Sequence, residues 1–434
     1  MLPRVNMKFL AALITTLSLA GISWASCGEV GVVDSAKSGT SVTNLRDQLR
    51  SAGYENFRTG RYPKALACYS EALQAAESLG SHDVIEIARD LNDIGVLAEE
   101  MGHYDEAKKY YSQELDVLKP LGDAAGAGLG QAYLLLGGLC VLQGSFDAAE
   151  THYKKAVTLL TRYAGPDDLR TVSALAALGR LYTAWGKWEE AFHLLRRARA
   201  IAENGTPRTS STLITILDSE ASLLSETGRF AEAEKSWVRA LQIAERLYGD
   251  NGLAYSAVLL HLGQLYTETR QFSSAQAILE RGLAAEQKTE GADGLDLSVM
   301  MSALGDVYLQ QHRLVDAEPF FVKSIQRLSS RCESAPLACS AIRTYAGDFY
   351  MAKRQWEAAE AQYELSLDMR EKTLGEHPLV ASSLISLSRA LQKLRRKKEA
   401  KAYMAHAQRI MSLPGNAAFS SENTIDVRAL RASN

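Results

Sequence analysis

The sequence predicts an all-α protein, built as a solenoid of about nine antiparallel helix pairs. One pattern of small and aromatic residues starts at Gly60 and returns every 42 residues along the chain. Within each copy, the spacing of these residues is that of one face of a helix. No stretch alternates apolar and polar residues strongly enough to indicate a strand. Because the repeat is regular, the 434 residues measure the number of repeats and not the number of compact domains.

The repeated pattern describes the second helix of each pair, which we call helix B. A Gly is followed by an aromatic residue two positions later, Ala five later, an aromatic residue or Leu nine later and a small residue twelve later. Small residues let a neighbouring helix approach closely, and the bulky residue one turn on fills the space beside it. The copies begin at Gly60, Gly102, Gly144, Gly186, Gly228, Arg270, His312 and Arg354, and a ninth, one residue short, holds Ala400, Met404 and Ala407.

The first helix of each pair, helix A, is marked by a second small residue seven positions before each of these starts. These residues are Gly53, Gly95, Gly137, Gly179, Ala221, Gly263, Gly305 and Gly347. Prolines support the same register, because a helix must stop before them. Five of the nine fall between helix B of one pair and helix A of the next: Pro120, Pro166, Pro207, Pro336 and Pro378.

These positions resemble the tetratricopeptide repeat family. The copy with Leu178, Gly179, Tyr182, Gly186 and Ala191 is the most similar, and the long period, with LNDIG at 91–95 and LGEHPLVASSL at 374–384, resembles the kinesin light chain type of repeat. The resemblance covers residues 44–413. It implies a right-handed superhelix with helix A on the concave face, and it leaves the function open because such repeats serve many partners.

The N-terminus has the form of a secretory signal. Arg4 and Lys8 precede an uncharged run from Phe9 to Cys27 that ends in small residues, and cleavage after Ala25 gives a signal peptide at 1–25. Two alternatives stay open. Cys27 is the lipidated residue of a lipoprotein in one, and the segment stays uncleaved as a membrane anchor in the other. Localisation is therefore expected to be exported, periplasmic or secreted.

The segments on either side of the solenoid have a different composition. Residues 26–43 are small, polar and rich in Gly and Ser, which predicts a flexible spacer. Residues 414–434 are polar, which predicts a disordered tail. The predicted organisation is thus signal peptide, spacer, solenoid at 44–413 and tail.

Charge and motifs indicate neither catalysis nor nucleic acid binding. A net charge of −3 gives no general attraction to nucleic acid or to an anionic membrane. The sequence has no metalloprotease, serine hydrolase, phosphate-binding-loop or paired-cysteine motif. The glycines at 126, 128 and 130 are interpreted as a flexible loop between repeats. We therefore expect no enzyme activity, cofactor, metal or small-molecule substrate.

The expected partner is a protein or an extended peptide that binds the concave face. Helical spacing, with helix A placed inside by the resemblance, gives a graded groove: Arg50, Tyr54, Arg89, Asn92, Leu134, Arg180, Asp218, Gln264, Asp306 and Asp348. The chain lacks the Lys and Asn pattern with which family members clamp a C-terminal carboxylate. A scaffold is the first functional hypothesis. The alternative is a regulatory or sensory subunit that changes its superhelical pitch on binding a peptide. A merely solvated inner face is the simplest interpretation of these charges.

The cysteines fall into two kinds of position. Cys332 and Cys339 flank Pro336 in a turn between repeats, so they are a candidate disulfide if the chain reaches an oxidising compartment. Cys68 and Cys140 stand at core positions of helices, where they are expected to be small buried hydrophobic residues, and neither has a partner near in sequence.

Overall fold

The structure is a computed structural model that describes residues 27, 42–58, 61–78, 84–101, 103–142, 145–204, 210–250, 253–288, 294–328, 332 and 336–413. These residues form helices and turns, with no strand among them, so the predicted all-α class is confirmed. The chain divides into two compact units, Met1–Leu139 with Thr158–Ala164, and Cys140–Val157 with Gly165–Asn434. The spacer and tail predicted at 26–43 and 414–434 lie outside the described residues, except for Cys27 and the start of the first helix.

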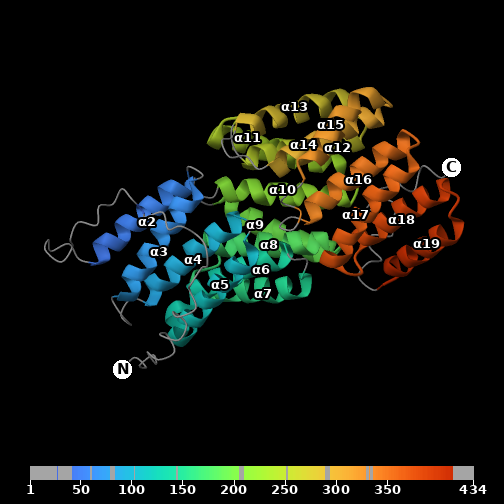
Figure 1. Cartoon of the computed structure of the whole chain (residues 1–434). Coiled ribbons are helices and arrows are strands. Elements are labelled where there is room, and N and C mark those ends of the chain that lie inside the picture. Colours follow the sequence, from blue (N-terminus) through green and yellow to red (C-terminus); the bar gives the residue numbers. More distant parts are fainter. Residues whose placement is uncertain are drawn as a thin grey trace. The chain divides into compact units, whose positions relative to one another are not determined.

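Unit 1 begins with two antiparallel helix pairs (Figure 1). The first pair is α2 (Val42–Arg58) with α3 (Tyr62–Ser78), and the second is α4 (Val84–Glu100) with α5 (Tyr104–Leu118). A 3-10 segment, η2 (Lys119–Ala125), leads into α6 (Gly126–Leu142), and α7 (Phe146–Tyr163) follows. Helix α7 is divided between the units: its residues up to Val157 belong to unit 2, and those from Thr158 onward belong to unit 1.

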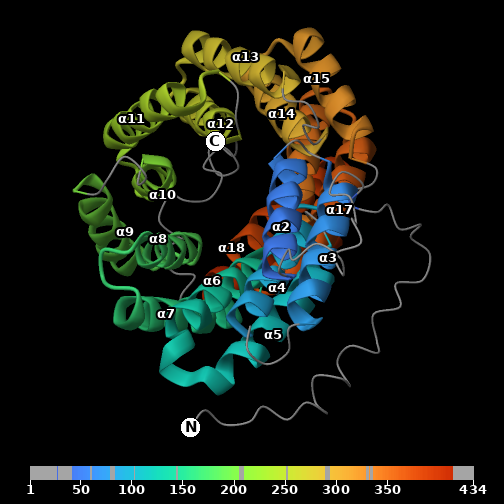
Figure 2. The same cartoon turned by 90° about the vertical axis from the view of Figure 1, so that its left-hand side faces the viewer.

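Unit 2 continues with six helix pairs, which follow one another along an arc (Figure 2). The pairs are α8 (Leu169–Ala184) with α9 (Trp188–Glu203), α10 (Ser210–Glu226) with α11 (Phe230–Tyr248), α12 (Leu253–Glu268) with α13 (Phe272–Lys288), α14 (Gly294–Gln310) with α15 (Leu314–Gln326), α16 (Pro336–Ala352) with α17 (Trp356–Leu374), and α18 (Pro378–Lys393) with α19 (Lys397–Met411). Pro336 and Pro378 are the first residues of their helices, where proline costs no hydrogen bond.

The small residues of the repeat lie where two helices of a pair come closest. The Ala of helix B is fully buried in eight successive repeats, from Ala65 to Ala359. The Gly of helix A faces the bulky residue of helix B: a Cβ added to Gly347 would lie 2.4 Å from Cε1 of Tyr363, and one added to Gly179 would lie 2.8 Å from Cγ of Leu195. The predicted packing of small against bulky residues is confirmed, and it accounts for the constant spacing of these residues within each pair.

The turn between helix A and helix B has one conformation in all the later repeats. Gly186 has a φ of 69°, and Arg270, His312 and Arg354, which replace the Gly, keep φ values of 59°, 60° and 58°. The amide of Lys187 donates to the carbonyl of Tyr182 at 2.9 Å, and the amide of the residue after each replaced Gly makes the same bond. Helix ends of this kind favour Gly, so the three larger residues adopt a strained left-handed backbone there.

The glycines at 126, 128 and 130 correct one expectation, because they lie in the first turns of α6 and not in a loop. A Cβ on Gly126 would lie 2.2 Å from Cδ2 of Tyr163, and a Cβ on Gly130 would lie 2.7 Å from Cγ of Leu160. The three glycines thus provide close helix packing. The backbone leaves helical geometry before these glycines, at Gly122 in η2, where φ is 56°.

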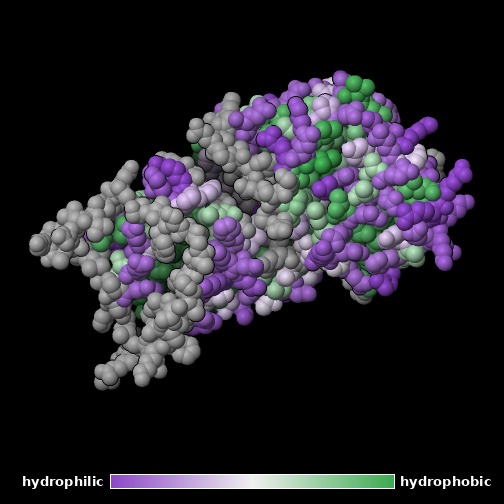
Figure 3. All heavy atoms as spheres, viewed as in Figure 1, coloured by the Kyte–Doolittle hydropathy of each residue, from purple (hydrophilic) through white to green (hydrophobic). Residues whose placement is uncertain are grey.

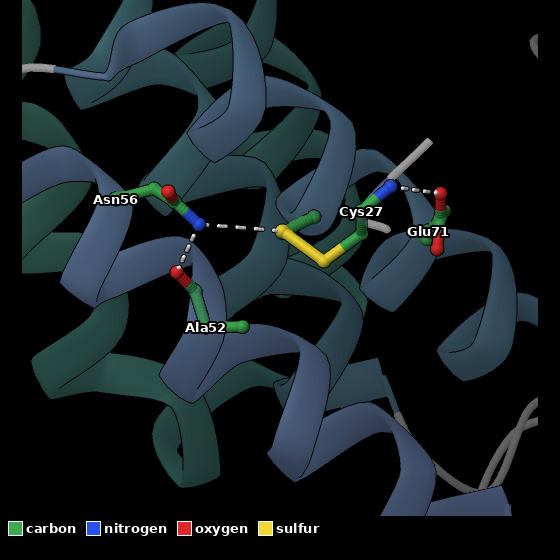
Figure 4. The surroundings of a disulfide bond; sticks show 5 residues. Cys27, Ala52, Asn56 and Glu71 are labelled. Carbon is green, nitrogen blue, oxygen red and sulfur yellow. Dashed lines mark hydrogen bonds between the residues drawn. A yellow bond between two sulfur atoms is a disulfide. The ribbon is translucent and has the colours of Figure 1, made fainter. Parts of the chain in front are cut away.

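Two disulfides occur in the described part of the chain. Cys332 and Cys339 are joined, with their Cα atoms 5.6 Å apart. Cys27 and Cys68 are also joined, with Cα atoms 4.8 Å apart, and the amide of Cys27 donates to Oε1 of Glu71 at 3.1 Å (Figure 4). The interpretation of Cys68 as only a small buried hydrophobic residue is therefore wrong, because its partner comes from 41 residues away, whereas Cys140 is buried and unlinked. Leu49 and Ala72 pack around the Cys27–Cys68 bridge.

One stretch, Tyr104–Val141, is long and apolar enough to cross a membrane by length and composition. It is not one continuous helix, because the backbone leaves helical geometry at Gly122. Its most apolar window is 44 % buried in the protein. In the structure this stretch is α5, η2 and α6, which pack on each other in the core of unit 1.

Candidate binding surfaces

The helix A residues of unit 1 begin with a network of charges between α2 and α4. The Arg50 side chain lies between two carboxylates, with Nε 3.0 Å from Asp90 and Nη2 2.6 Å from Asp93. Arg46 reaches Glu86 at 2.9 Å. Burial raises the pKa of the fully buried Asp90 to about 7, although the two arginines act in the opposite direction. Arg50 is therefore largely engaged in ion pairs between α2 and α4.

The other predicted residues of unit 1 differ in how far they are available. Tyr54 is 61 % exposed, and Arg89 is exposed with its guanidinium 2.7 Å from Glu86 on the same helix. Asn92 donates to the buried Glu114 on α5 at 3.1 Å, which makes it a link between the two helices of a pair. Burial raises the pKa of Glu114 to about 8. Leu134 on α6 is half-buried.

In unit 2 the predicted residue Asp218 on α10 is the centre of a polar cluster with Trp237 and His261. Trp237 Nε1 donates to Oδ1 of Asp218 at 2.8 Å, and Nδ1 of His261 on α12 lies 2.6 Å from the same oxygen. Burial opposes ionisation of Asp218, but hydrogen bonds from His261 and Trp237 and the charge of Arg180 outweigh it and lower the pKa of Asp218. Burial likewise opposes charge on His261, yet Asp218 raises its pKa. The pair is thus stabilised as imidazolium and carboxylate.

Two acidic residues lie at the ends of the same two helices. Burial, followed by the charge of Glu268 on α12, raises the pKa of Glu226 on α10 to about 7. Arg180 on α8 is exposed, and Gln264 on α12 is half-buried.

The sequence missed His261 and Trp237, because neither occupies one of the two helix positions that define the predicted groove. A further criterion, the residue directly after the fifth helix A position, would have found His261.

The two remaining predicted residues, Asp306 and Asp348, form hydrogen bonds within their own helix pairs. Asp306 on α14 is only 4 % exposed and accepts from Nε2 of Gln310 on the same helix at 3.1 Å. Asp348 on α16 accepts from the hydroxyl of Tyr363 at 2.6 Å, in the same helix pair. Reversing either charge would therefore disturb packing within a pair, so these residues are poor probes of a binding surface.

The described residues differ in how far they could hold a metal ion or an apolar partner. No group of three His, Cys, Asp or Glu side chains among the described residues is arranged to hold a metal ion. In Figure 3, the coloured part of the drawn face is mostly hydrophilic, and groups of hydrophobic residues lie between the hydrophilic ones. Val315, at 85 % exposure, is the most exposed of the large hydrophobic residues in the described part of the chain. Scattered residues of this kind are normal on a protein surface.

Comparison with known families identifies the repeat. A family model described as tetratricopeptide repeat matches residues 49–119, 128–204, 212–287 and 338–412, which is more than half of the chain. No curated protein sequence matches the chain.

Several solved structures are similar to this one. A Rap protein complexed with Competence and Sporulation Factor is 14 % identical, with 84 % of this chain and 97 % of that chain covered and a TM-score of 0.58. Aspartyl phosphate phosphatase F from Bacillus subtilis is 14 % identical over 87 % of this chain and 96 % of that chain, with a TM-score of 0.53. Repeats of a putative kinesin light chain from Podosopora anserina are 20 % identical over 47 % of this chain and 96 % of that one, with a TM-score of 0.38. The first two likenesses extend over most of the chain and show a shared fold.

Proposed function

Because the chain belongs to the tetratricopeptide repeat family, we propose that it is an exported, non-enzymatic scaffold that binds a protein or an extended peptide on its helix A surface. Repeat proteins of this kind bury their small repeated residues in helix packing, and their remaining helix surface is available for partners. The proposal adds two statements to the family assignment: the compartment, and the surface that is used.

The pairing of four cysteines supports the first statement. Both disulfides join residues that the fold brings together, and disulfides persist in oxidising compartments but are rare in the cytosol. Cys27 stands two residues after the predicted cleavage site at Ala25. A Cys27 sulfur in a disulfide has no thiol left to receive a lipid, so the pairing favours a cleaved signal over the lipoprotein alternative.

The second statement rests on the side chains of α8, α10 and α12. Arg180 is exposed and its charge acts on Asp218, and the Asp218–His261 pair adds charges of both signs near it. Such a surface suits a partner that has charged and hydrogen-bonding groups of its own better than it suits an apolar partner. Electrostatic contacts of this kind favour fast and selective association, which weakens as salt rises.

Alkylation of the exported protein tests the compartment. The full-length chain is expressed in its natural host, the envelope or medium fraction is alkylated without reductant, and the peptides are identified by mass spectrometry. We expect Cys140 alone to react after denaturation, with the N-terminus at Ser26. Alkylated Cys27, Cys68, Cys332 and Cys339, or a lipid on Cys27, would contradict the proposal.

A charge-reversal pair tests the surface. Arg180→Glu changes an exposed residue of helix A in α8, and Arg246→Glu makes the same change on exposed helix B surface in α11. The wild type and both variants are cross-linked in the exported fraction, and the captured partner is quantified. We expect Arg180→Glu to lose most of the partner and Arg246→Glu to retain it. Equal capture by all three proteins would place the binding surface elsewhere.

A further inference from the structure

Three aromatic side chains from distant parts of unit 2 meet at one point. The ring of Phe146, the first residue of α7, lies 5.7 Å from the ring of His377 at an interplanar angle of 69°. The ring of Trp185, just after α8, lies 6.1 Å from Phe146 at 78°. Both are edge-to-face arrangements, which are favourable between aromatic rings. His377 also contacts the backbone of α8, with Nε2 3.3 Å from the carbonyl oxygen of Ala184.

The hydrogen bonds of His377 define its protonation. The amide of Leu379 donates to Nδ1 at 3.1 Å, so His377 caps the N-terminus of α18 through that nitrogen. Since Nδ1 accepts, the ring proton is on Nε2, which therefore donates to Ala184. Carbonyls at the end of a helix lack partners within the helix, and the imidazole supplies one to α8. Both ring nitrogens of the neutral imidazole are thus satisfied.

This contact is unlike the others that hold the solenoid together. His377 and Ala184 are 193 residues apart, whereas the packing of a repeat protein comes from adjacent repeats. Nothing in the packing of the pair α8–α9 or of the pair α18–α19 requires the other. The arc of unit 2 returns toward its start at this point (Figure 2). The contact is therefore a separate element of the tertiary structure, with its own free energy.

We propose that Phe146, Trp185 and His377 form a latch that closes the superhelical turn of unit 2, and that breaking the latch opens the turn while every helix pair stays folded. A solenoid bends by small rotations between neighbouring repeats, so the pitch of the intervening pairs is free to change once the two ends separate. This goes beyond the proposed function, since it needs no partner.

Burial, together with the charge of Arg370, keeps His377 neutral in the closed state. Arg370 on α17 is buried and donates to the carbonyl oxygen of Leu379 and to the hydroxyl of Ser383, beside the first turn of α18. Burial first, and then the charge of Arg370, lower the pKa of His377 to about 4. Two other charged groups lie nearby. The Nζ atom of Lys187 is 4.0 Å from the centre of the Trp185 ring, and Glu376, the residue before His377, forms an ion pair with Arg409. Protonated His377 would thus lie near the like charge of Arg370 and lose its acceptor for Leu379.

Two substitutions break the latch at different points. Phe146→Ala removes the ring that both other aromatic residues contact. His377→Asn keeps a good N-cap for α18 but is too short to reach Ala184, so it separates the latch from the cap. Phe230→Ala is the matched control, because Phe230 begins α11 at the position that Phe146 has in α7, two repeats later.

Small-angle scattering and hydrogen exchange of the full chain at neutral pH test the proposal. We expect both latch variants to have a larger radius of gyration than the wild type at unchanged helical circular dichroism, and Phe230→Ala to match the wild type. Backbone exchange should increase severalfold at 181–187 and at 146–150, far in sequence from position 377.

The second latch variant keeps the experiment decisive if the first variant misfolds. If Phe146→Ala loses helicity, His377→Asn alone decides the result. A His377→Asn protein that is fully helical, scatters like the wild type and exchanges faster only at 378–382 would show that His377 is merely a cap, and would overturn the latch.

Discussion

Reduction of the Cys27–Cys68 disulfide is expected to lower the free energy of unfolding of the first helix pair by about 4 kcal/mol. The two residues are 41 positions apart, and the loss of loop-closure entropy from the denatured chain for a loop of this length gives that value. The Cys332–Cys339 disulfide closes only 7 positions, for which the same relation gives about 2 kcal/mol. The Cys27–Cys68 bridge is thus expected to stabilise the fold more than the Cys332–Cys339 bridge, because it closes the longer loop.

The measurement compares oxidised and reduced forms of the same chain, so that no buried atoms are removed. In a Cys332→Ser background, reduction reports on Cys27–Cys68 alone, and in a Cys27→Ser background it reports on Cys332–Cys339. Urea unfolding is followed by circular dichroism, together with hydrogen exchange of α2 and α3, because a solenoid unfolds by parts. Cys140 is buried and not disulfide-linked in the folded chain, so it is the same in both forms that are compared.

Equal losses from the two bridges, or a larger loss from Cys332–Cys339, would refute the loop-length reasoning. An unchanged exchange rate in α2 and α3 after reduction of Cys27–Cys68 would show that this bridge adds no stability to the first pair. The buried contacts of Cys68 with Leu49 and Ala72 would then be sufficient by themselves.

Three other substitutions or conditions test the packing. Ala191→Phe overfills a fully buried helix crossing and should cost about 1–3 kcal/mol, seen as a lower melting temperature; an unchanged value would contradict the packing. Arg354→Gly relieves left-handed backbone strain of about 1 kcal/mol, partly offset by the greater freedom of Gly when unfolded, so the melting temperature should rise; a fall would show that the Arg354 side chain matters more. The lowered pKa of His377, about 4, means that the unfolded chain binds its proton first as pH falls below 6.5. His377 should therefore contribute a loss of stability of up to about 3 kcal/mol between pH 6.5 and 4. This loss is measured as the difference between the pH profiles of the wild type and His377→Asn, because Asp90, Glu114 and Glu226, whose pKa values are raised, act in the opposite direction in both proteins; equal profiles would contradict it.

The regular part of the fold is determined by the sequence alone, for a local reason. Helix geometry places residues five, nine and twelve positions after the Gly on one face, so spacing by itself assigns the series from Ala65 to Ala359 to the buried crossing. The turn between Cys332 and Cys339 is short, so chain connectivity by itself brings the two residues near each other. The turn residues Arg270, His312 and Arg354 are recognisable because they keep the register of a Gly.

The candidate surface is predicted less well, because helical spacing gives the side of a helix but not the neighbours of a side chain. Spacing places Asp306 and Asp348 in the groove, whereas packing buries the first and bonds the second to Tyr363. Spacing also selects Asp218, yet the partner of Asp218, His261, comes from the next helix A, 43 residues away. The charge state of such a residue depends on that partner and on burial, neither of which a single helix reveals.

Only the tertiary structure decided which distant residues meet. The pairing of Cys27 with Cys68 spans a segment without a repeat pattern, and the glycines at 126, 128 and 130 pack within α6 although their composition favours a loop. The contact of His377 with Ala184 depends on the sum of small rotations over the intervening helix pairs. Each rotation is set by side-chain packing between neighbouring repeats, and the sequence period does not specify it, because the same period is compatible with many superhelical pitches.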